Sequence, residues 1–142
     1  MDIDAKSLIA KNEGLKLKPY LCPAGKLTIG YGHNLDDNGI PQFIADELLK
    51  YDMQKAHDDL VSIFKYPLDD LITDNRYAAL LDMMFNLGKP TFLEFKKMIT
   101  AIKQGDWSKA ADELKDSAYY KQVGNRAKVN ENILRYDTDE TQ

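Results

Sequence analysis

From residue 42 to residue 134, apolar side chains recur at the spacing of one face of a helix. The pattern is clearest over residues 42–65, where charged residues separate six apolar ones: Ile44, Leu48, Met53, Ala56, Leu60 and Phe64. This stretch predicts a long amphipathic helix. Pro67 is expected to end it, because proline lacks the N–H group that a helix needs.

Four more helices are predicted from capping residues that precede apolar runs. The expected caps and ends are Thr73 to Gly88, Thr91 to Gly105, Asp106 onward, and a last helix from about Asn125. Residues 137–142 have nothing apolar to bury, so we expect this tail to fray.

The amino-terminal part has a different sequence pattern. A short helix is predicted over residues 3–14, and the Pro- and Gly-broken apolar runs of residues 15–33 predict a small β hairpin. The Asp-Asp-Asn-Gly run makes residues 34–39 a predicted loop. The order helix, hairpin and five helices predicts a single α+β domain. Its β-rich lobe would span residues 15–40 and its helical lobe residues 41–136 with the first helix, with a ligand cleft between them.

Composition excludes several classes of protein. The chain has 142 residues, the size of one ordinary domain. Its net charge is −4 and no basic stripe is present, so nucleic acid is not an expected partner. Charged residues interrupt every apolar stretch well before the roughly 18 residues of a membrane span. The acidic start, with no apolar run after it, predicts that the chain carries no signal peptide.

Cysteine and glycine suggest other chemistry only weakly. Cys22 is the one cysteine, so no disulfide forms within the chain, and the distant His33 and His57 make a metal site unexpected. No Gly-Lys-Ser or Gly-Lys-Thr follows the glycines of the hairpin, so a phosphate-binding loop is not predicted. No thiol-protease signature surrounds Cys22 and His33. We therefore expect no cofactor.

The hairpin region carries a motif of another kind. Glu13-Gly14-Leu15-x-Leu17-x-x-Tyr20, followed by Gly25-x-x-Thr28-Ile29-Gly30-Tyr31-Gly32-His33, resembles the phage-type lysozymes, the muramidase family that includes the T-even phage lysozyme and endolysins. The resemblance implies a lysozyme-like fold and a catalytic triad of Glu13, Cys22 and Thr28. Aspartate is more familiar than cysteine at the second position of that triad.

The resemblance continues to about residue 135. Asp52 matches the aspartate that pairs with the histidine of the family's Gly-x-Gly-His strand, which here is His33. Phe85-Asn86-Leu87-Gly88, Trp107 with Ala110 and Ala111, Tyr119-Tyr120 and Asn125-Arg126-Ala127 match later motifs. The resemblance implies that Asn86, Tyr119 and Arg126 are candidate sugar contacts, although each has a purely structural alternative. Only eighteen residues separate His33 from Asp52, which predicts a small β lobe.

The implied activity is hydrolysis of the β-1,4 bond between N-acetylmuramic acid and N-acetylglucosamine in bacterial peptidoglycan. Glu13 would protonate the leaving oxygen, while Cys22 and Thr28 hold the attacking water, which gives inversion. An ionised Glu13 nearby is expected to raise the pKa of the Cys22 thiol above its usual value of about 8.5. A thiolate that attacks the sugar, with retention, is the alternative mechanism.

A non-catalytic descendant that binds peptidoglycan or acts as a scaffold is the alternative function. For either function we expect a monomer made in the host cytoplasm and acting at the periplasmic wall. A holin, which opens the membrane, or a virion would have to deliver it.

Overall fold

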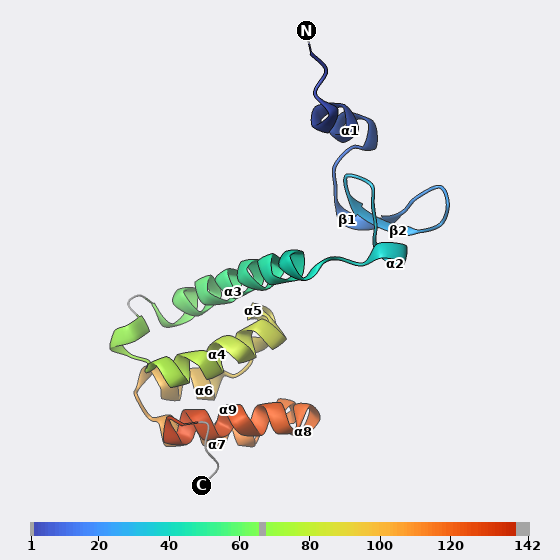
Figure 1. Cartoon of the computed structure of the whole chain (residues 1–142). Coiled ribbons are helices and arrows are strands. Elements are labelled where there is room, and N and C mark those ends of the chain that lie inside the picture. Colours follow the sequence, from blue (N-terminus) through green and yellow to red (C-terminus); the bar gives the residue numbers. More distant parts are fainter. Residues whose placement is uncertain (1, 66–67, 139–142) are drawn as a thin grey trace. The chain divides into compact units, whose positions relative to one another are not determined.

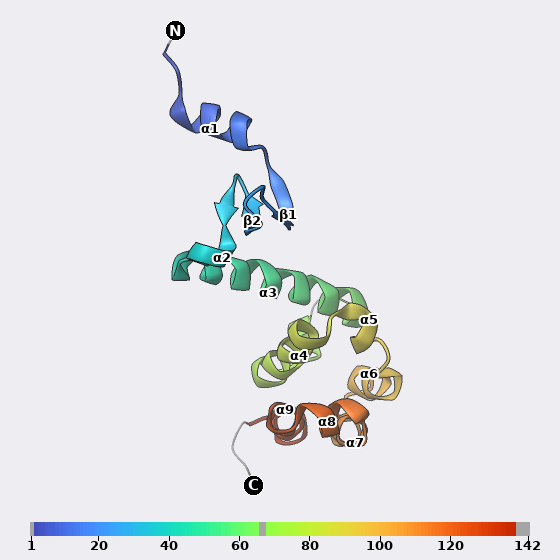
Figure 2. The ribbon, with the colours of Figure 1, turned by 90° about the vertical axis from the view of Figure 1, so that its right-hand side faces the viewer.

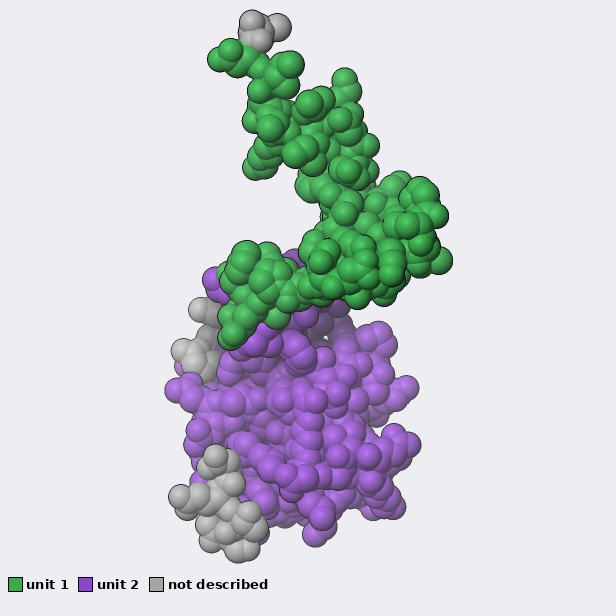
Figure 3. Space-filling model, turned by 45° about the vertical axis from the view of Figure 1, so that its right-hand side comes forward, with its two compact units in different colours: residues 1–48 green, residues 49–142 purple. Residues whose placement is uncertain are grey.

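A computed structural model describes residues 2–65 and 68–138. The chain divides into two compact units, residues 1–48 and residues 49–142, coloured separately in Figure 3. The α+β class predicted from the sequence is confirmed: a small antiparallel sheet lies in the first unit and the second unit is helical.

The first unit begins with helix α1 (Ala5–Glu13), which confirms the helix predicted over residues 3–14. Asp4 caps it: its carboxylate accepts hydrogen bonds from the backbone N–H of Ser7 at 3.2 Å and from the Ser7 hydroxyl at 2.6 Å. The helix stops at Gly14, so Glu13 is its last residue and lies where the chain turns toward the sheet.

The sheet has three strands in the order β1 (Lys16–Leu21), β2 (Leu27–Gly30) and β3 (His33–Asn34), all antiparallel. Tyr20 pairs with Thr28 across β1 and β2, and Ile29 pairs with His33 across β2 and β3. The register is irregular between Lys16 and Tyr20. This sheet confirms the hairpin predicted over residues 15–33.

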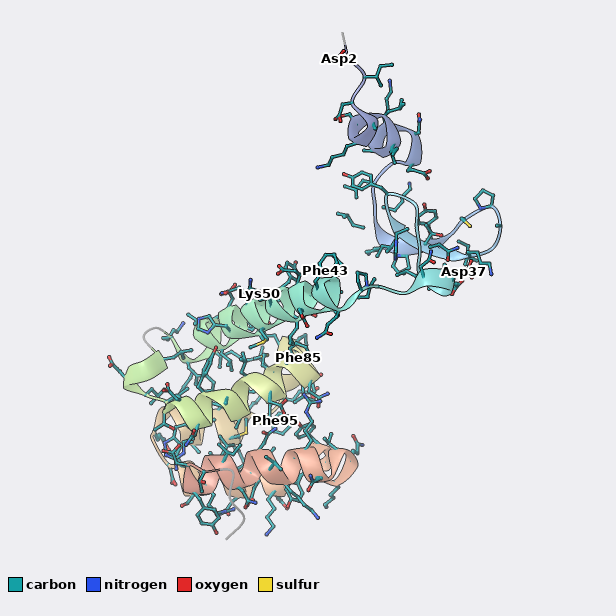
Figure 4. All side chains as sticks on the ribbon, in the orientation of Figure 1. Asp2, Asp37, Phe43, Lys50, Phe85 and Phe95 are labelled. Carbon is teal, nitrogen blue, oxygen red and sulfur yellow. The ribbon has the colours of Figure 1, made fainter. Side chains whose placement is uncertain are left out.

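The predicted loop over residues 34–39 is wrong, because helix α2 (Leu35–Asn38) forms there. Asn34 caps α2 by accepting a hydrogen bond from the N–H of Asp37 at 3.0 Å. The two aspartates in its first turn favour the helix and also hold the sheet: Asp36 accepts from the N–H of Leu27 at 2.6 Å, and Asp37 pairs with Lys26 at 3.1 Å. Figure 4 labels Asp37 on α2.

Helix α3 (Gln42–Phe64) confirms the long helix predicted over residues 42–65. It runs across the boundary of the two units, and its buried residues lie in its last part: Ala56, Leu60, Ile63 and Phe64. Pro67, the expected end of this helix, lies outside the described residues. A hydrogen bond of 2.8 Å between His57 Nδ1 and the Tyr77 hydroxyl ties α3 to the next long helix.

The second unit continues with a short 3-10 turn and six helices, seen in two views in Figures 1 and 2. They are η1 (Leu68–Asp70), α4 (Asp74–Leu87), α5 (Lys89–Phe92), α6 (Lys96–Lys103), α7 (Trp107–Lys115), α8 (Ala118–Val123) and α9 (Asn125–Tyr136). Helix α9 packs against α7, α8 and α4, and α7 also packs against α6. The core that they enclose is apolar, and its largest fully buried side chains are Phe92, Leu60, Leu80, Met83, Met84, Met98, Ile102, Leu114 and Leu134.

The capping predictions had mixed outcomes. Thr73 and Asp106 cap α4 and α7 as predicted, and α9 begins at Asn125. The prediction for Thr91 is wrong, because that residue lies inside α5, whose start carries Pro90. A separate helix, α6, follows after Phe95, and α8 was not predicted, so the expected count of five helices was too low.

The predicted fraying from residue 137 is also wrong at that residue. Asp137 Oδ1 accepts a hydrogen bond from the Thr73 hydroxyl at 2.7 Å, and its backbone oxygen accepts from Asn75 Nδ2 at 2.7 Å. Residues 139–142 lie outside the described part. Within residues 2–65 and 68–138, no helix has both the length and the apolar character that crossing a membrane requires.

Candidate active site

Glu13 lies against the turn that joins β2 to β3. A Cβ atom built on Gly32 would be only 2.5 Å from Glu13 Oε2 and 2.9 Å from Glu13 Cδ. Gly32 also has a φ of +72°, a backbone conformation that favours glycine. The Glu13 side chain is exposed, and its carboxylate lies over the backbone of this turn. The acid thus stands where the end of the helix meets the sheet.

Cys22 and Thr28 meet at one backbone oxygen. The Lys26 carbonyl accepts hydrogen bonds from the Cys22 N–H at 2.9 Å and from the Thr28 hydroxyl at 2.8 Å. Thr28 is buried in β2, with 3% of its surface exposed, and Cys22 is half-buried just after β1. The turn between them is closed by a 2.8 Å hydrogen bond from the Gly25 N–H to the Cys22 oxygen. The structure thus brings these two residues of the expected triad together.

The pKa of the Cys22 thiol is lowered, so the expected upward shift is wrong. The largest cause is a backbone hydrogen bond from Lys26, and smaller contributions come from the backbone of Ala24 and the Thr28 hydroxyl; partial burial acts in the opposite direction. Together these interactions favour the anionic form of the sulfur over the thiol. The nearest donors of the turn, and not the charge of Glu13, set the direction of this shift.

His33 and Asp52 lie in different units. The observed partner of His33 is the carbonyl oxygen of Gly39, which lies 2.5 Å from Nε2. Asp52 is exposed on α3 and lines a hollow of about 170 Å³ in the second unit. The other residues around this hollow are Lys55, Ala56, Asp59, Met84, Phe85 and Gly88. The pairing of His33 with Asp52 stays a prediction.

The candidate sugar contacts of the second unit lie on α4, α8 and α9. Asn86 is exposed in the last turn of α4, beside Phe85, which Figure 4 labels. Tyr119 has 8% of its surface exposed, and its ring packs edge-on against Phe95 at a centroid distance of 5.9 Å. This burial favours the structural alternative that the sequence left open for Tyr119.

Arg126 is bound to a residue that the sequence motifs did not single out. Its Nε and Nη2 atoms donate to the Asp82 carboxylate at 2.9 and 2.8 Å. Asn130, one turn further along α9, donates to the same carboxylate at 2.9 Å. The only signal for Asp82 in the sequence is its place on α4 four residues before Asn86, which puts both on one helix face.

Residues 2–65 and 68–138 contain no group of three His, Cys, Asp or Glu side chains close enough to hold a metal ion.

Comparison with known proteins agrees with the motifs. The family model described as phage lysozyme matches residues 10–134, which is most of the chain. The chain belongs to the phage lysozyme family. This family membership covers both units, from the last part of α1 to the last part of α9.

Relatives of this phage lysozyme family member include endolysins and a spike protein. It is 36% identical over 110 residues to an endolysin of Acyrthosiphon pisum secondary endosymbiont phage 1, which covers 75% of the chain and 71% of that protein. It is 35% identical over 92 residues to the endolysin of Salmonella phage P22, covering 59% of the chain and 60% of that protein. It is also 30% identical over 146 residues to the pre-baseplate central spike protein Gp5 of Enterobacteria phage T4, covering 84% of the chain but 25% of that protein.

Proposed function

We propose that this phage lysozyme family member is a peptidoglycan hydrolase that cleaves the β-1,4 bond between N-acetylmuramic acid and N-acetylglucosamine. The observation that carries the proposal is the place of Glu13, whose carboxylate lies over the backbone at Gly32. Glycoside hydrolysis needs one carboxylic acid that protonates the leaving oxygen, and Glu13 is the residue that matches the acid of the family motif. Asn86 and Arg126 are the proposed sugar contacts, whereas the buried Tyr119 takes the structural alternative.

Water attacks the anomeric carbon as the glycosidic bond breaks. The oxygen of the water forms the new bond and Glu13 gives its proton to the departing sugar oxygen. The water, which Cys22 and Thr28 hold, loses a proton to Cys22 when that thiol is ionised. The Thr28 hydroxyl donates its hydrogen to the Lys26 carbonyl, so its lone pairs remain for a hydrogen bond from that water. This arrangement gives inversion at the anomeric carbon.

The lowered pKa of Cys22 also supports a second mechanism. A thiolate is a good nucleophile, and its attack on the anomeric carbon would give a covalent glycosyl-enzyme that water then hydrolyses, with retention. NMR of the first product formed from a muramyl oligosaccharide separates the two. The inverted anomer supports the mechanism with bound water, whereas the retained anomer assigns Cys22 as the nucleophile.

The test of hydrolysis uses purified peptidoglycan and the release of reducing ends. Glu13→Gln keeps the size of the side chain but removes its acidic proton, so the rate should fall about 10²–10⁴-fold. Equal rates for Glu13→Gln and the wild type would remove Glu13 from the mechanism. A zymogram addresses the alternative function: binding without clearing by the wild type would support a wall-binding scaffold.

The names of these relatives suggest two routes of delivery. Two are endolysins and one is a central spike protein, so a holin-dependent route and a virion-borne route are both consistent with the family. We propose that the chain works as a monomer made in the host cytoplasm and acting on the periplasmic wall. Lysis of cells that express it with and without a holin distinguishes the routes.

A further inference from the structure

We infer that Asp82 is a positioning residue for the substrate: it fixes the guanidinium of Arg126 and neutralises its charge, so that Arg126 selects an uncharged oxygen of the glycan. This inference rests on the proposed function, because it names the part of the substrate that the second unit recognises. It concerns only residues of that unit, on α4, α8 and α9.

The geometry of the pair leaves one end of the guanidinium available. Arg126 Nε donates to Asp82 Oδ2 at 2.9 Å, and Nη2 donates to Oδ1 at 2.8 Å and to the Asp82 backbone oxygen at 3.5 Å. Within residues 2–65 and 68–138, Nη1 has no hydrogen-bond partner, and 43% of the Arg126 side chain is exposed. Two N–H donors therefore remain at a fixed position, since a bidentate pair allows little rotation.

Asn130 also donates to this carboxylate. It is 3% exposed, lies one turn after Arg126 on α9, and donates from Nδ2 to Asp82 Oδ2 at 2.9 Å. The hydrogen bond from Arg126 is the main reason that the pKa of Asp82 is lowered, and Asn130 adds to it. Asp82 therefore stays ionised near neutral pH, and its charge offsets that of Arg126.

Tyr119 closes the inner side of this cluster. Its hydroxyl is fully enclosed and has no hydrogen-bond partner among the described residues. Burial is the main cause of its raised pKa, and the charge of Asp82 adds to it. The tyrosine thus stays neutral and adds no charge to the cluster.

The chemistry of the ligand group follows from this balance of charge. A free guanidinium would attract a carboxylate, whereas a neutralised one offers directional N–H donors with little net charge. Asn86 lies one turn after Asp82 on the same face of α4 and adds an amide donor and an amide acceptor. These groups match the hydroxyl and acetamido oxygens that an amino sugar carries.

The decisive experiment measures binding in a Glu13→Gln background, so that hydrolysis does not interfere. Two probes are used at low and at high salt: an uncharged oligosaccharide of N-acetylglucosamine, and a muramyl oligosaccharide that carries a carboxylate. The parent should bind both with little dependence on salt. Asp82→Asn leaves the charge of Arg126 uncompensated, so affinity for the uncharged probe should fall about tenfold. Affinity for the muramyl probe should fall less and become dependent on salt.

Asp112→Asn is the matched control. It removes an exposed carboxylate that pairs with Arg135, also on α9, at 2.7 Å, far along that helix from Arg126. It should leave both affinities as in the parent. Asp82→Glu keeps the charge but changes the geometry of the pair. It should therefore lower the affinity for both probes equally, and these affinities should not depend on salt. If Asp82→Asn does not fold, Asp82→Glu is the variant that tests the inference.

Three results would overturn the inference. Unchanged affinities for both probes in Asp82→Asn would show that Asp82 does not position Arg126 for the ligand. If Asp112→Asn lowered the affinities as much as Asp82→Asn, both substitutions would act through the stability of the fold and not through Arg126. If the parent binds neither probe, the inference is also wrong, while hydrolysis by the wild type with Glu13 intact still tests the proposed function separately.

Discussion

Glu13 occupies the space that a side chain at residue 32 would need, with its Oε2 atom 2.5 Å from the position of a Cβ there. A collision so short cannot be tolerated without movement of the carboxylate or of the turn. The identity of residue 32 and the position of the acid are therefore linked within the first unit.

Gly32→Ala should lower both stability and activity. The positive φ would cost about 1–2 kcal/mol of unfolding free energy, and displacement of Glu13 would lower the rate of hydrolysis by about 10²-fold. Gly105→Ala is the matched control, because Gly105 has a φ of +73° and nothing within 4 Å of its built Cβ. It should lose a similar amount of stability and keep its activity. Equal activity of the two variants would contradict the link to Glu13.

The thiol of Cys22 should titrate at a lower pH in the folded chain than in the unfolded chain, because hydrogen bonds of the turn, chiefly from the Lys26 backbone, lower its pKa. Ultraviolet absorbance of the thiolate against pH measures this directly. At a pH between the pKa of this thiol in the folded chain and its pKa in the unfolded chain, the unfolded chain binds more protons. Stability relative to Cys22→Ser should thus rise with pH across that interval and be lost as pH falls through the folded pKa. A titration above the usual value would reject this account.

Cys22→Asp should preserve or raise the rate of hydrolysis, because a carboxylate can accept the proton of the attacking water near neutral pH. Cys22→Ala removes the proton acceptor and should lower the rate well below both. The measurement is release of reducing ends from peptidoglycan at one pH near neutrality. If Cys22→Ala matched the wild type, residue 22 would have no part in water activation.

Thr73→Val should destabilise the chain by about 1–2 kcal/mol, measured by chemical denaturation. Thr73 accepts from the N–H of Arg76 at 3.3 Å as the cap of α4, and it donates to Asp137 at 2.7 Å. Valine has nearly the same shape but makes neither bond. The control is Thr91→Val, at an exposed position that caps no helix, where the change should stay within about 0.5 kcal/mol. Similar losses at both positions would refute the assignment of the cap.

The predicted pair of His33 and Asp52 is open to a double-mutant cycle. His33→Asn, Asp52→Asn and the double variant should give an interaction energy of about 0.5–1 kcal/mol if the two side chains bind one another. Additive losses would mean that the hydrogen bond to the Gly39 carbonyl is the only role of His33 in stability.

Helices with a sustained apolar period were predictable from the sequence. Residues 42–65 and the capped run from Thr73 show why: the period and the cap agree, so little is left for tertiary packing to decide. The four-residue helices α2 and α5 were not predictable. In α2 the acidic residues that suggested a loop instead favour the first turn of a helix, and in α5 the proline favours a start one residue after Gly88.

The site was predictable where local motifs carry it and not where distant residues meet. Glu13, Cys22 and Thr28 stand close together in the sequence, and the hairpin brings the last two together. Asp82 and Arg126 lie 44 residues apart, and only the packing of α4 against α9 joins them. The direction of the pKa shift of Cys22 was predicted wrongly, because the sequence does not show which backbone N–H groups a folded turn brings near the thiol.

The oxygen that joins Cys22 to Thr28 belongs to the main chain of Lys26 and not to its side chain. Replacing the lysine would therefore leave this junction intact. A survey of substitutions would score position 26 as tolerant, even though the thiol and the hydroxyl both depend on it. Peptide-bond changes, such as an ester in place of the amide, are the way to expose that dependence.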